Sequence, residues 1–155
     1  MENVFLTIFD IFNFGLLIFL WWFTLKNYNA LPQTIPIYFD FKGKADNFGS
    51  KKYSFLMPVI LTVLYLFLVF AVRHPESVNY PIGITEKNED SQFLIMKIFM
   101  RWLLILVMGI FLNIQDYMFR YSVDESAKPR VPLSTAILSL FASLIVVFIF
   151  VGIFK

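Results

Sequence analysis

The sequence lacks cysteine altogether and contains a single histidine, His74. Without cysteine the chain cannot form disulfides or use thiol chemistry, and cysteine-based metal sites are excluded. One histidine alone does not build a transition-metal site, so we expect neither a metal nor a cofactor. Charge is also scarce, because 15% of the residues are charged and the net charge is +2. This small charge argues against a nucleic-acid partner.

Recognisable catalytic motifs are missing as well. The sequence contains no nucleophile elbow, no phosphate-binding loop, no HExxH motif and no Ser/His/Asp arrangement. We therefore predict no catalytic residue and expect a protein that is not an enzyme.

Hydrophobic residues are what the chain has in excess. They make up 59% of it and include 20 phenylalanines, and the mean hydropathy is +0.72. Soluble domains are roughly 45–50% apolar and about 25% charged. The composition therefore predicts one integral membrane domain over residues 1–155, with the lipid bilayer as its main partner and the cell (inner or cytoplasmic) membrane as its multi-pass location.

Long apolar runs predict an all-α membrane protein with four transmembrane helices. A helix needs about 20 mostly apolar residues to cross a bilayer. Such runs occupy residues 4–25, 55–72, 93–114 and 133–154. The third run is the weakest, since Lys97 and Arg101 interrupt it. The first is expected to remain in the mature protein, because Trp21 and Trp22 at its end are typical of an interfacial anchor rather than a cleavage site.

The basic residues of the connections predict an orientation. If all four helices cross, the first and third connections share one side, where the basic residues are Lys26, Lys42, Lys44, Lys51, Lys52, Arg120, Lys128 and Arg130. The opposite side has Arg73, Lys87 and Lys155, with Lys97 and Arg101 nearby. The positive-inside rule then puts the first connection in the cytoplasm and both termini outside.

The connection over residues 31–51 differs in character from the helices around it. From Thr34 to Phe41 apolar residues alternate, which predicts a strand. Residues 42–46 and 47–50 are typical of turns, and Gly43 and Gly49 are expected to supply positive φ angles. The segment is predicted to be a short hairpin-like flap whose apolar face lies against the helix ends or the lipid headgroups.

The same segment resembles a known family signature. The residues that carry the resemblance are Leu31, Pro32, Ile35, Pro36, Phe39, Gly43, Asp46, Gly49, Ser50 and Lys51. Their pattern is similar to that of domain of unknown function family 1648, a set of bacterial membrane proteins that includes the immunity proteins against the sporulation-delaying toxin. A second stretch, residues 75–88, also resembles such proteins.

What the resemblance implies is a family, a membrane fold and a role in toxin immunity, with a toxin peptide or a partner membrane protein as the binding partner. Relatives commonly have a histidine where this chain has Tyr38 and a tryptophan where it has Phe48. A proton- or metal-binding role of that histidine is therefore not available to this chain.

Four polar residues fall within the predicted spans. Asp10 and Asn13 share a helix face, and Lys97 and Arg101 lie four residues apart on the third helix. Ionisable groups in a span usually face the bundle interior. A pair between Asp10 and Arg101 or Lys97 would lock the first and third helices together. The alternative is that Asp10 and Lys97 extend to the interface.

Further polar and small residues suggest structural contacts. At the far end of the third helix, Asn113, Gln115 and Asp116 are expected to meet Lys51, Lys52 or the backbone of the flap. Asp40 and Asp46 stand among lysines and offer too few oxygens for a cation site, so Asp46 is predicted to form a turn. The last helix has small residues that predict packing within the bundle, with a homo-oligomer contact as the alternative: Thr135, Ala136, Ser139, Ala142 and Ser143.

Three functions remain open at this point. The leading hypothesis is a non-enzymatic membrane protein that protects against, or senses, a membrane-active peptide or toxin. The second is a small transporter or channel component, and the third is a subunit of a larger membrane complex.

Overall fold

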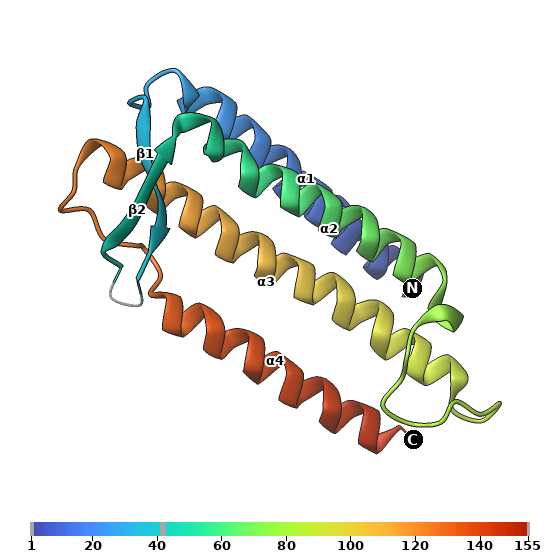
Figure 1. The fold of residues 1–155 in the computed structure, drawn as a ribbon. Coiled ribbons are helices and arrows are strands. Elements are labelled where there is room, and N and C mark those ends of the chain that lie inside the picture. Colours follow the sequence, from blue (N-terminus) through green and yellow to red (C-terminus); the bar gives the residue numbers. More distant parts are fainter. Residues whose placement is uncertain (1, 41–42, 155) are drawn as a thin grey trace.

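Four long helices account for most of the chain in the computed structural model, which describes residues 2–40 and 43–154. The helices run antiparallel to their neighbours in sequence, and a β-hairpin lies at the end of the molecule opposite the two termini (Figure 1). Their bounds are α1 Glu2–Tyr28, α2 Leu56–Arg73, α3 Glu89–Val123 and α4 Leu133–Ile153. A 3₁₀ helix, η1 (Lys51–Phe55), leads directly into α2, and a second one, η2 (Pro75–Ser77), follows it. The predicted helical fold with a flap between the first two helices is confirmed.

Within the described residues, four helices are long and apolar enough to cross a membrane. These candidate spans are Val4–Tyr28, Lys51–Arg73, Glu89–Val123 and Leu133–Ile153. The chain is therefore a multi-pass membrane protein. The third span, the least certain from the sequence, is the longest helix of all. At about 1.5 Å per residue, the 35 residues of α3 extend about 52 Å, which exceeds the roughly 30 Å of hydrocarbon in a bilayer.

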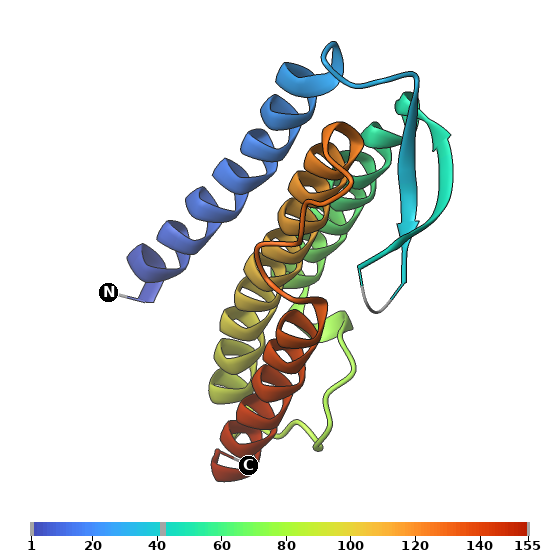
Figure 2. The same cartoon turned by 90° about the vertical axis from the view of Figure 1, so that its left-hand side faces the viewer.

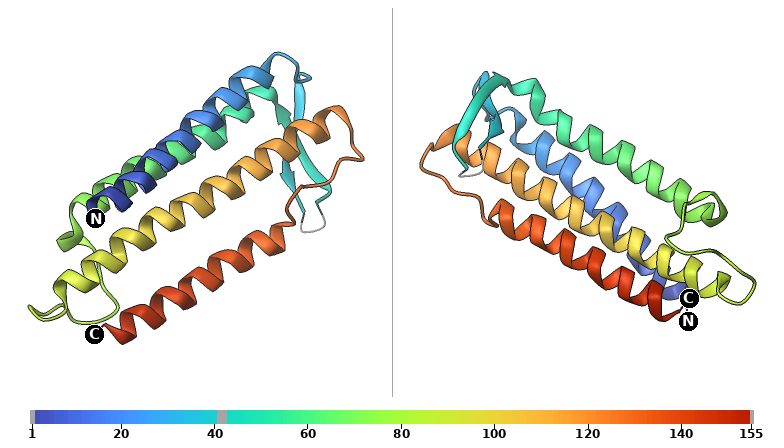
Figure 3. Two further views of the ribbon diagram at one scale, coloured as in Figure 1. Left: turned by 180° about the vertical axis from the view of Figure 1, so that it is seen from behind. Right: turned by 60° about the horizontal axis from the view of Figure 1, so that its bottom comes forward.

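Helix α3 is the central element, because it contacts each of the other three helices. Between α1, α2 and α3 lies an apolar cluster of Leu17, Leu20, Leu61, Leu104 and Met108. Helix α4 lies against α3 on the side away from α1 and α2 (Figure 3). Most of its surface is exposed, so lipid rather than protein surrounds much of α4.

The flap is a two-stranded antiparallel hairpin, with β1 over Thr34–Phe39 and β2 over Ala45–Ser50. Figure 2 shows it beside the bundle, away from both termini. The prediction of a strand from Thr34 was correct, although β1 ends at Phe39, and Phe41 and Lys42 lie outside the described residues. The prediction of a second turn at residues 47–50 was wrong. Those residues pair with β1, because Pro36 on this edge strand stands opposite Phe48 and Thr34 opposite Ser50.

The turn of the hairpin is built on Asp40 rather than Asp46. The Asp40 carboxylate accepts from the backbone amide of Lys44 at 2.8 Å, and its carbonyl accepts from the amide of Gly43 at 2.9 Å. Gly43 has a φ of +80°, which favours glycine there. Asp46 lies in β2 with an exposed side chain, so its predicted role as a turn residue was wrong.

Gly49 does not have a positive φ, contrary to the prediction, since Gly43 is the one positive-φ glycine among the described residues. Its requirement is for space instead. A Cβ atom at Gly49 would lie 3.0 Å from Cδ1 of Ile37 and 3.1 Å from a ring carbon of Tyr53. Glycine thus allows the side chains of β1 and η1 to close over β2.

The apolar face of β1 packs on the C-terminal part of α3. Ile35 is fully buried, and Leu31 packs with it against Met118 and Phe119. The rings of Phe39 and Tyr117 lie 4.5 Å apart between centroids. The predicted position of the flap against the helix ends is therefore correct.

The charge distribution predicts the side of the membrane on which the hairpin lies, and labelling can measure it. Because the chain has no cysteine, Asp46→Cys on the exposed edge of β2 introduces a single thiol. We expect an impermeant thiol reagent to leave Asp46→Cys unlabelled in whole cells and to label it after permeabilisation, since the positive-inside rule puts the hairpin in the cytoplasm.

The matched control is Asn79→Cys, an exposed position in the connection between α2 and α3 at the opposite end of the bundle. It should be labelled in whole cells. The reverse pattern of labelling would show that the hairpin faces outward.

Candidate functional site

Two groups of polar residues lie at opposite ends of the bundle, and each contains buried oxygen atoms that have no hydrogen-bond partner among the described residues. These atoms are Oγ of Ser54 and Oε1 of Gln115 at the hairpin end, and Oδ1 of Asn13 at the other end. At the hairpin end, Gln115 of α3 is fully buried. Its amide nitrogen donates to Oγ1 of Thr24 on α1 at 3.1 Å and to the carbonyl of Ser54 at 2.9 Å. Gln115 was expected to contact Lys51, Lys52 or the flap, but it ties α1 and η1 to α3 instead.

The other polar residues of this end hold the connection between α3 and α4. Asn113 exchanges two hydrogen bonds with the backbone of Val131, at 2.8 and 3.0 Å. Asp116 accepts from Arg120 and Arg130, each at 2.9 Å. The expectation that Asn113 and Asp116 fasten the flap was therefore wrong.

This connection is also stabilised at its start, just beyond α3. The amide and hydroxyl of Ser126 both donate to the carboxylate of Asp124, and these hydrogen bonds lower the pKa of Asp124 below its usual range.

Residues of the family signature act in folding the hairpin. The Ser50 hydroxyl caps η1 by accepting from the amide of Lys52. The amide of Lys51 donates to Gln33 at 2.9 Å, and its ammonium lies 4.7 Å above the ring of Tyr28. The Tyr117 hydroxyl donates to the carbonyl of Gly43, which fixes the turn to α3. Pro32 is exposed and Pro36 is buried.

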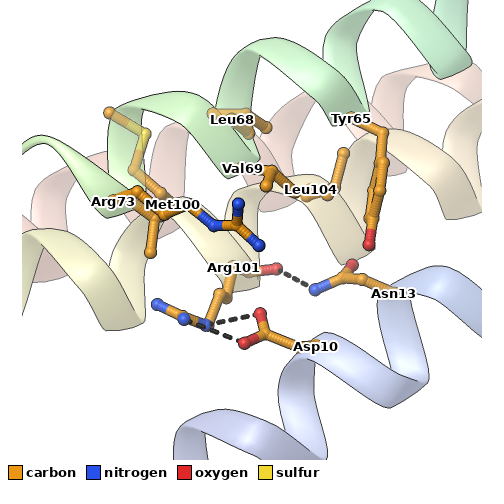
Figure 4. Close-up of a pocket in the computed structure, with 10 residues that line it drawn as sticks. Asp10, Asn13, Tyr65, Leu68, Val69, Arg73, Met100, Arg101 and Leu104 are labelled. Carbon is orange, nitrogen blue, oxygen red and sulfur yellow. Dashed lines mark hydrogen bonds and ion pairs between the residues drawn. The ribbon is translucent and has the colours of Figure 1, made fainter.

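At the opposite end, Asp10 of α1 and Arg101 of α3 form an ion pair with two parallel hydrogen bonds (Figure 4). The distances are 2.8 Å from Nε to Oδ1 and 3.0 Å from the second nitrogen to Oδ2. The Arg101 side chain is 11% exposed and that of Asp10 is 52% exposed. Of the two cations considered from the sequence, Arg101 takes this contact, and Lys97 contributes its backbone carbonyl to Arg101 at 3.0 Å.

Asn13 follows Asp10 by about one turn of α1 and is 1% exposed. Its amide nitrogen donates to the carbonyl of Arg101 at 3.1 Å. Its Oδ1 atom has no hydrogen-bond partner among the described residues and points toward the hydroxyl of Tyr65 in Figure 4.

These side chains line a cavity of about 160 Å³ between α1, α2 and α3. The sequence did not reveal two of its polar groups, Tyr65 and Arg73, both on α2. Arg73 ends that helix, and its guanidinium lies over the cavity beside Arg101 (Figure 4). A residue at the end of a hydrophobic run is typical of an interfacial anchor, so only the packing of three helices shows that it belongs to this cavity.

An apolar groove of about 470 Å³ runs between α3 and α4. Its one internal polar contact is a hydrogen bond of 3.0 Å from the Trp102 indole to the Ser143 hydroxyl. Of the small residues on α4, Ala136 is buried and Ser139 and Ser143 are half-buried, whereas Thr135 and Ala142 are exposed. Packing within the bundle thus accounts for only part of this stripe. The residues that line the groove are Ile95, Ile98, Phe99, Trp102, Ala142, Ser143, Val146, Val147 and Phe150.

The described residues contain no group of three or more His, Cys, Asp or Glu side chains that could hold a metal ion. His74 is exposed at the end of α2, where it lies 3.3 Å from a carboxylate oxygen of Glu76 and against the ring of Phe70.

Comparisons with known proteins give a family match over one segment in the first half of the chain. Residues 15–62 match the sequence model of the family described as Domain of unknown function (DUF1648). An uncharacterized protein of Archaeoglobus fulgidus is 31% identical over 70 residues, which cover 40% of this chain and 38% of the relative. This chain therefore spans well under two thirds of that relative. No solved structure matches.

The family resemblance of the sequence is thus confirmed over residues 15–62, which form the second half of α1, the hairpin, η1 and the start of α2. The link to immunity proteins stays a prediction.

The Asp10–Arg101 pair can be tested by a double-mutant cycle. Asp10→Asn and Arg101→Gln each leave one charge without its partner in a partly buried site. We expect a coupling energy of about 1 to 2 kcal/mol between them, measured by unfolding of the protein in detergent micelles and followed by tryptophan fluorescence.

The control cycle is Asp116→Asn with Arg130→Gln, because the Arg130 side chain is 71% exposed. Its coupling should be below about 1 kcal/mol. Strictly additive effects of the Asp10 and Arg101 substitutions would mean that the pair does not lock α1 to α3.

Proposed function

We propose that the chain is a non-enzymatic protein of the cytoplasmic membrane that binds a membrane-active peptide or toxin within the bilayer and so protects the cell. The observation that carries the proposal is the apolar groove between α3 and α4. The resemblance to a family that includes toxin immunity proteins supports the choice of occupant.

The groove has the properties that an inserted peptide helix requires. Its walls are apolar. On the α4 side Ala142, Val146 and Val147 present no large ring, and Phe150 contributes the one ring among the described lining residues of that helix. Small residues let two helices approach closely in lipid, where packing rather than hydrophobicity drives association. The Trp102–Ser143 hydrogen bond leaves no unpaired donor on the groove wall. A peptide helix can therefore exchange lipid contacts for protein contacts without burying a polar group.

A binding role also agrees with the chemistry at the two ends of the bundle. Gln115, Asn113 and Asp116 are all engaged in contacts between helices and connections. Asp10 is engaged by Arg101. The Asp10 carboxylate, held by two hydrogen bonds to the Arg101 guanidinium, thus acts as a structural contact between α1 and α3.

The alternative of a small transporter or channel component has one observation in its favour, the polar cavity beside Asp10 and Asn13. The apolar cluster of Leu17, Leu20, Leu61, Leu104 and Met108 lies between this cavity and the polar residues of the hairpin end. A continuous path through one chain is therefore blocked, and conduction would require association with a further copy or another subunit.

Filling the groove tests the proposed function. In a toxin-sensitive bacterial strain, expression of the chain should raise survival in the presence of the sporulation-delaying toxin or a related membrane-active peptide. Ala142→Phe should lower that protection about tenfold, since a loss of roughly 1.4 kcal/mol in binding is a factor of ten in affinity.

The matched control is Ile145→Phe, which adds a ring on the lipid-facing side of α4, where Ile145 is 62% exposed. It should protect as well as the unsubstituted chain at equal membrane levels. No protection by the unsubstituted chain, together with no co-purified peptide, would end the proposal. Full protection by Ala142→Phe would show that the groove is not the binding site.

A further inference from the structure

We propose that the cavity between Asp10, Asn13, Tyr65 and Arg73 binds the headgroup of an anionic phospholipid that carries hydroxyl groups, of the phosphatidylglycerol class. The proposal concerns a site at the opposite end of the bundle from the hairpin and does not depend on the peptide-binding function.

The first argument is a buried acceptor without a donor. Oδ1 of Asn13 is unpartnered, although the residue is 1% exposed and lines the cavity. A buried carbonyl left without a hydrogen bond costs about 1–3 kcal/mol. The site therefore favours a ligand with an O–H or N–H group at this point. The hydroxyl of Tyr65, on the same wall in Figure 4, can donate to an oxygen of that ligand.

The second argument is charge. Asp10 neutralises Arg101 through the two hydrogen bonds already described. Arg73 has no hydrogen bond or ion pair to another of the described residues, and its guanidinium faces the cavity (Figure 4). Two arginines and one aspartate leave one uncompensated positive charge, which matches a single phosphodiester. Guanidinium groups recognise phosphate oxygens through two parallel hydrogen bonds.

The third argument is position in the membrane. Arg73 is the last residue of the second candidate span, so it lies where the hydrocarbon gives way to headgroups. A lipid phosphate occupies that same level. The apolar part of the wall, formed by Val69, Val72 and Met100, suits the glycerol backbone and the first carbons of an acyl chain.

The fourth argument is size. The cavity of about 160 Å³ is comparable to an engineered cavity of about 150 Å³ that holds a benzene ring. It admits a glycerol group but not the length of an acyl chain, so the chain beyond its first carbons must lie outside along α2 and α3. An ethanolamine headgroup fits less well, because its ammonium would be brought close to Arg73 and Arg101.

Native mass spectrometry of the purified protein can measure which lipids are retained. The lipid probes are phosphatidylglycerol and phosphatidylethanolamine of equal acyl-chain length. Glycerol 3-phosphate and inorganic phosphate are tested separately as soluble ligands. We expect the unsubstituted protein to retain phosphatidylglycerol at least tenfold better than phosphatidylethanolamine, and Arg73→Gln to reduce that retention about tenfold. Tyr65→Phe, which removes only a hydroxyl, should reduce it about threefold.

Arg130→Gln is the control, since this arginine is at the hairpin end and pairs with Asp116; it should leave lipid retention unchanged. Equal retention of the two lipids by the unsubstituted protein would overturn the proposal, as would unchanged retention by both cavity variants. Binding of glycerol 3-phosphate or phosphate without retention of phosphatidylglycerol would overturn the assignment to a lipid. Thermal unfolding in detergent distinguishes a loss of binding from a loss of fold.

Discussion

The arrangement of the bundle depends on one buried amide. In a bilayer, a polar group in the protein interior must find its partners within the protein, because no water is available there. The amide nitrogen of Gln115 meets this requirement through three elements at once, since it lies on α3 and donates to Thr24 of α1 and to the carbonyl of Ser54 in η1, just before α2. Its Oε1 atom has no partner among the described residues. Thr24 in turn donates to the carbonyl of Leu20 on its own helix. Any shift of α1 or α2 along α3 would leave these groups unpaired, so the contact fixes the relative height of three helices. The hydrogen bond from the Trp21 indole on α1 to the Thr62 hydroxyl on α2 acts in the same way.

The hairpin then follows from what Gln115 fixes. Once the end of α1 and the start of α2 are held beside α3, the connection between them must return over a short distance, and two strands with a tight turn achieve this. The hairpin buries Ile35 and Leu31 against Met118 and Phe119, one turn beyond Gln115 on the same helix. The opposite end of the bundle has no hairpin among the described residues. There the Asp10–Arg101 pair links only α1 and α3, and α2 passes at enough distance to leave a polar cavity.

The sequence predicted the elements better than the contacts between them. Apolar runs give helices because the bilayer demands them, and the alternation after Thr34 gave β1. The spacing of Asp10 from Asn13 and of Lys97 from Arg101 put these residues on shared helix faces, which was enough to suggest the pair with Arg101. It was not enough to find Arg73, whose role comes from the packing of α2. Asp40 and Asp46 are chemically alike, and only the strand register decides which one forms the turn. Gly49 shows the same limit, because its need for space comes from Ile37 and Tyr53, which no local pattern contains.

The residues of the family signature therefore serve the folding of the hairpin more than the binding of a partner. Gly43, Ser50 and Lys51 serve the turn, the cap of η1 and the junction with α1, and Ile35 serves the contact with α3. The side chains that point away from α3 are different ones. Tyr38, Phe48 and Tyr53 are 58%, 51% and 53% exposed, and aromatic rings of this kind favour the level of the lipid headgroups. The hairpin thus has one face that holds it to the protein and another suited to rest on the membrane surface. The sites that we propose for ligand recognition therefore lie away from the hairpin, in the groove between α3 and α4 and in the cavity beside Asp10, where Oδ1 of Asn13 has no partner among the described residues.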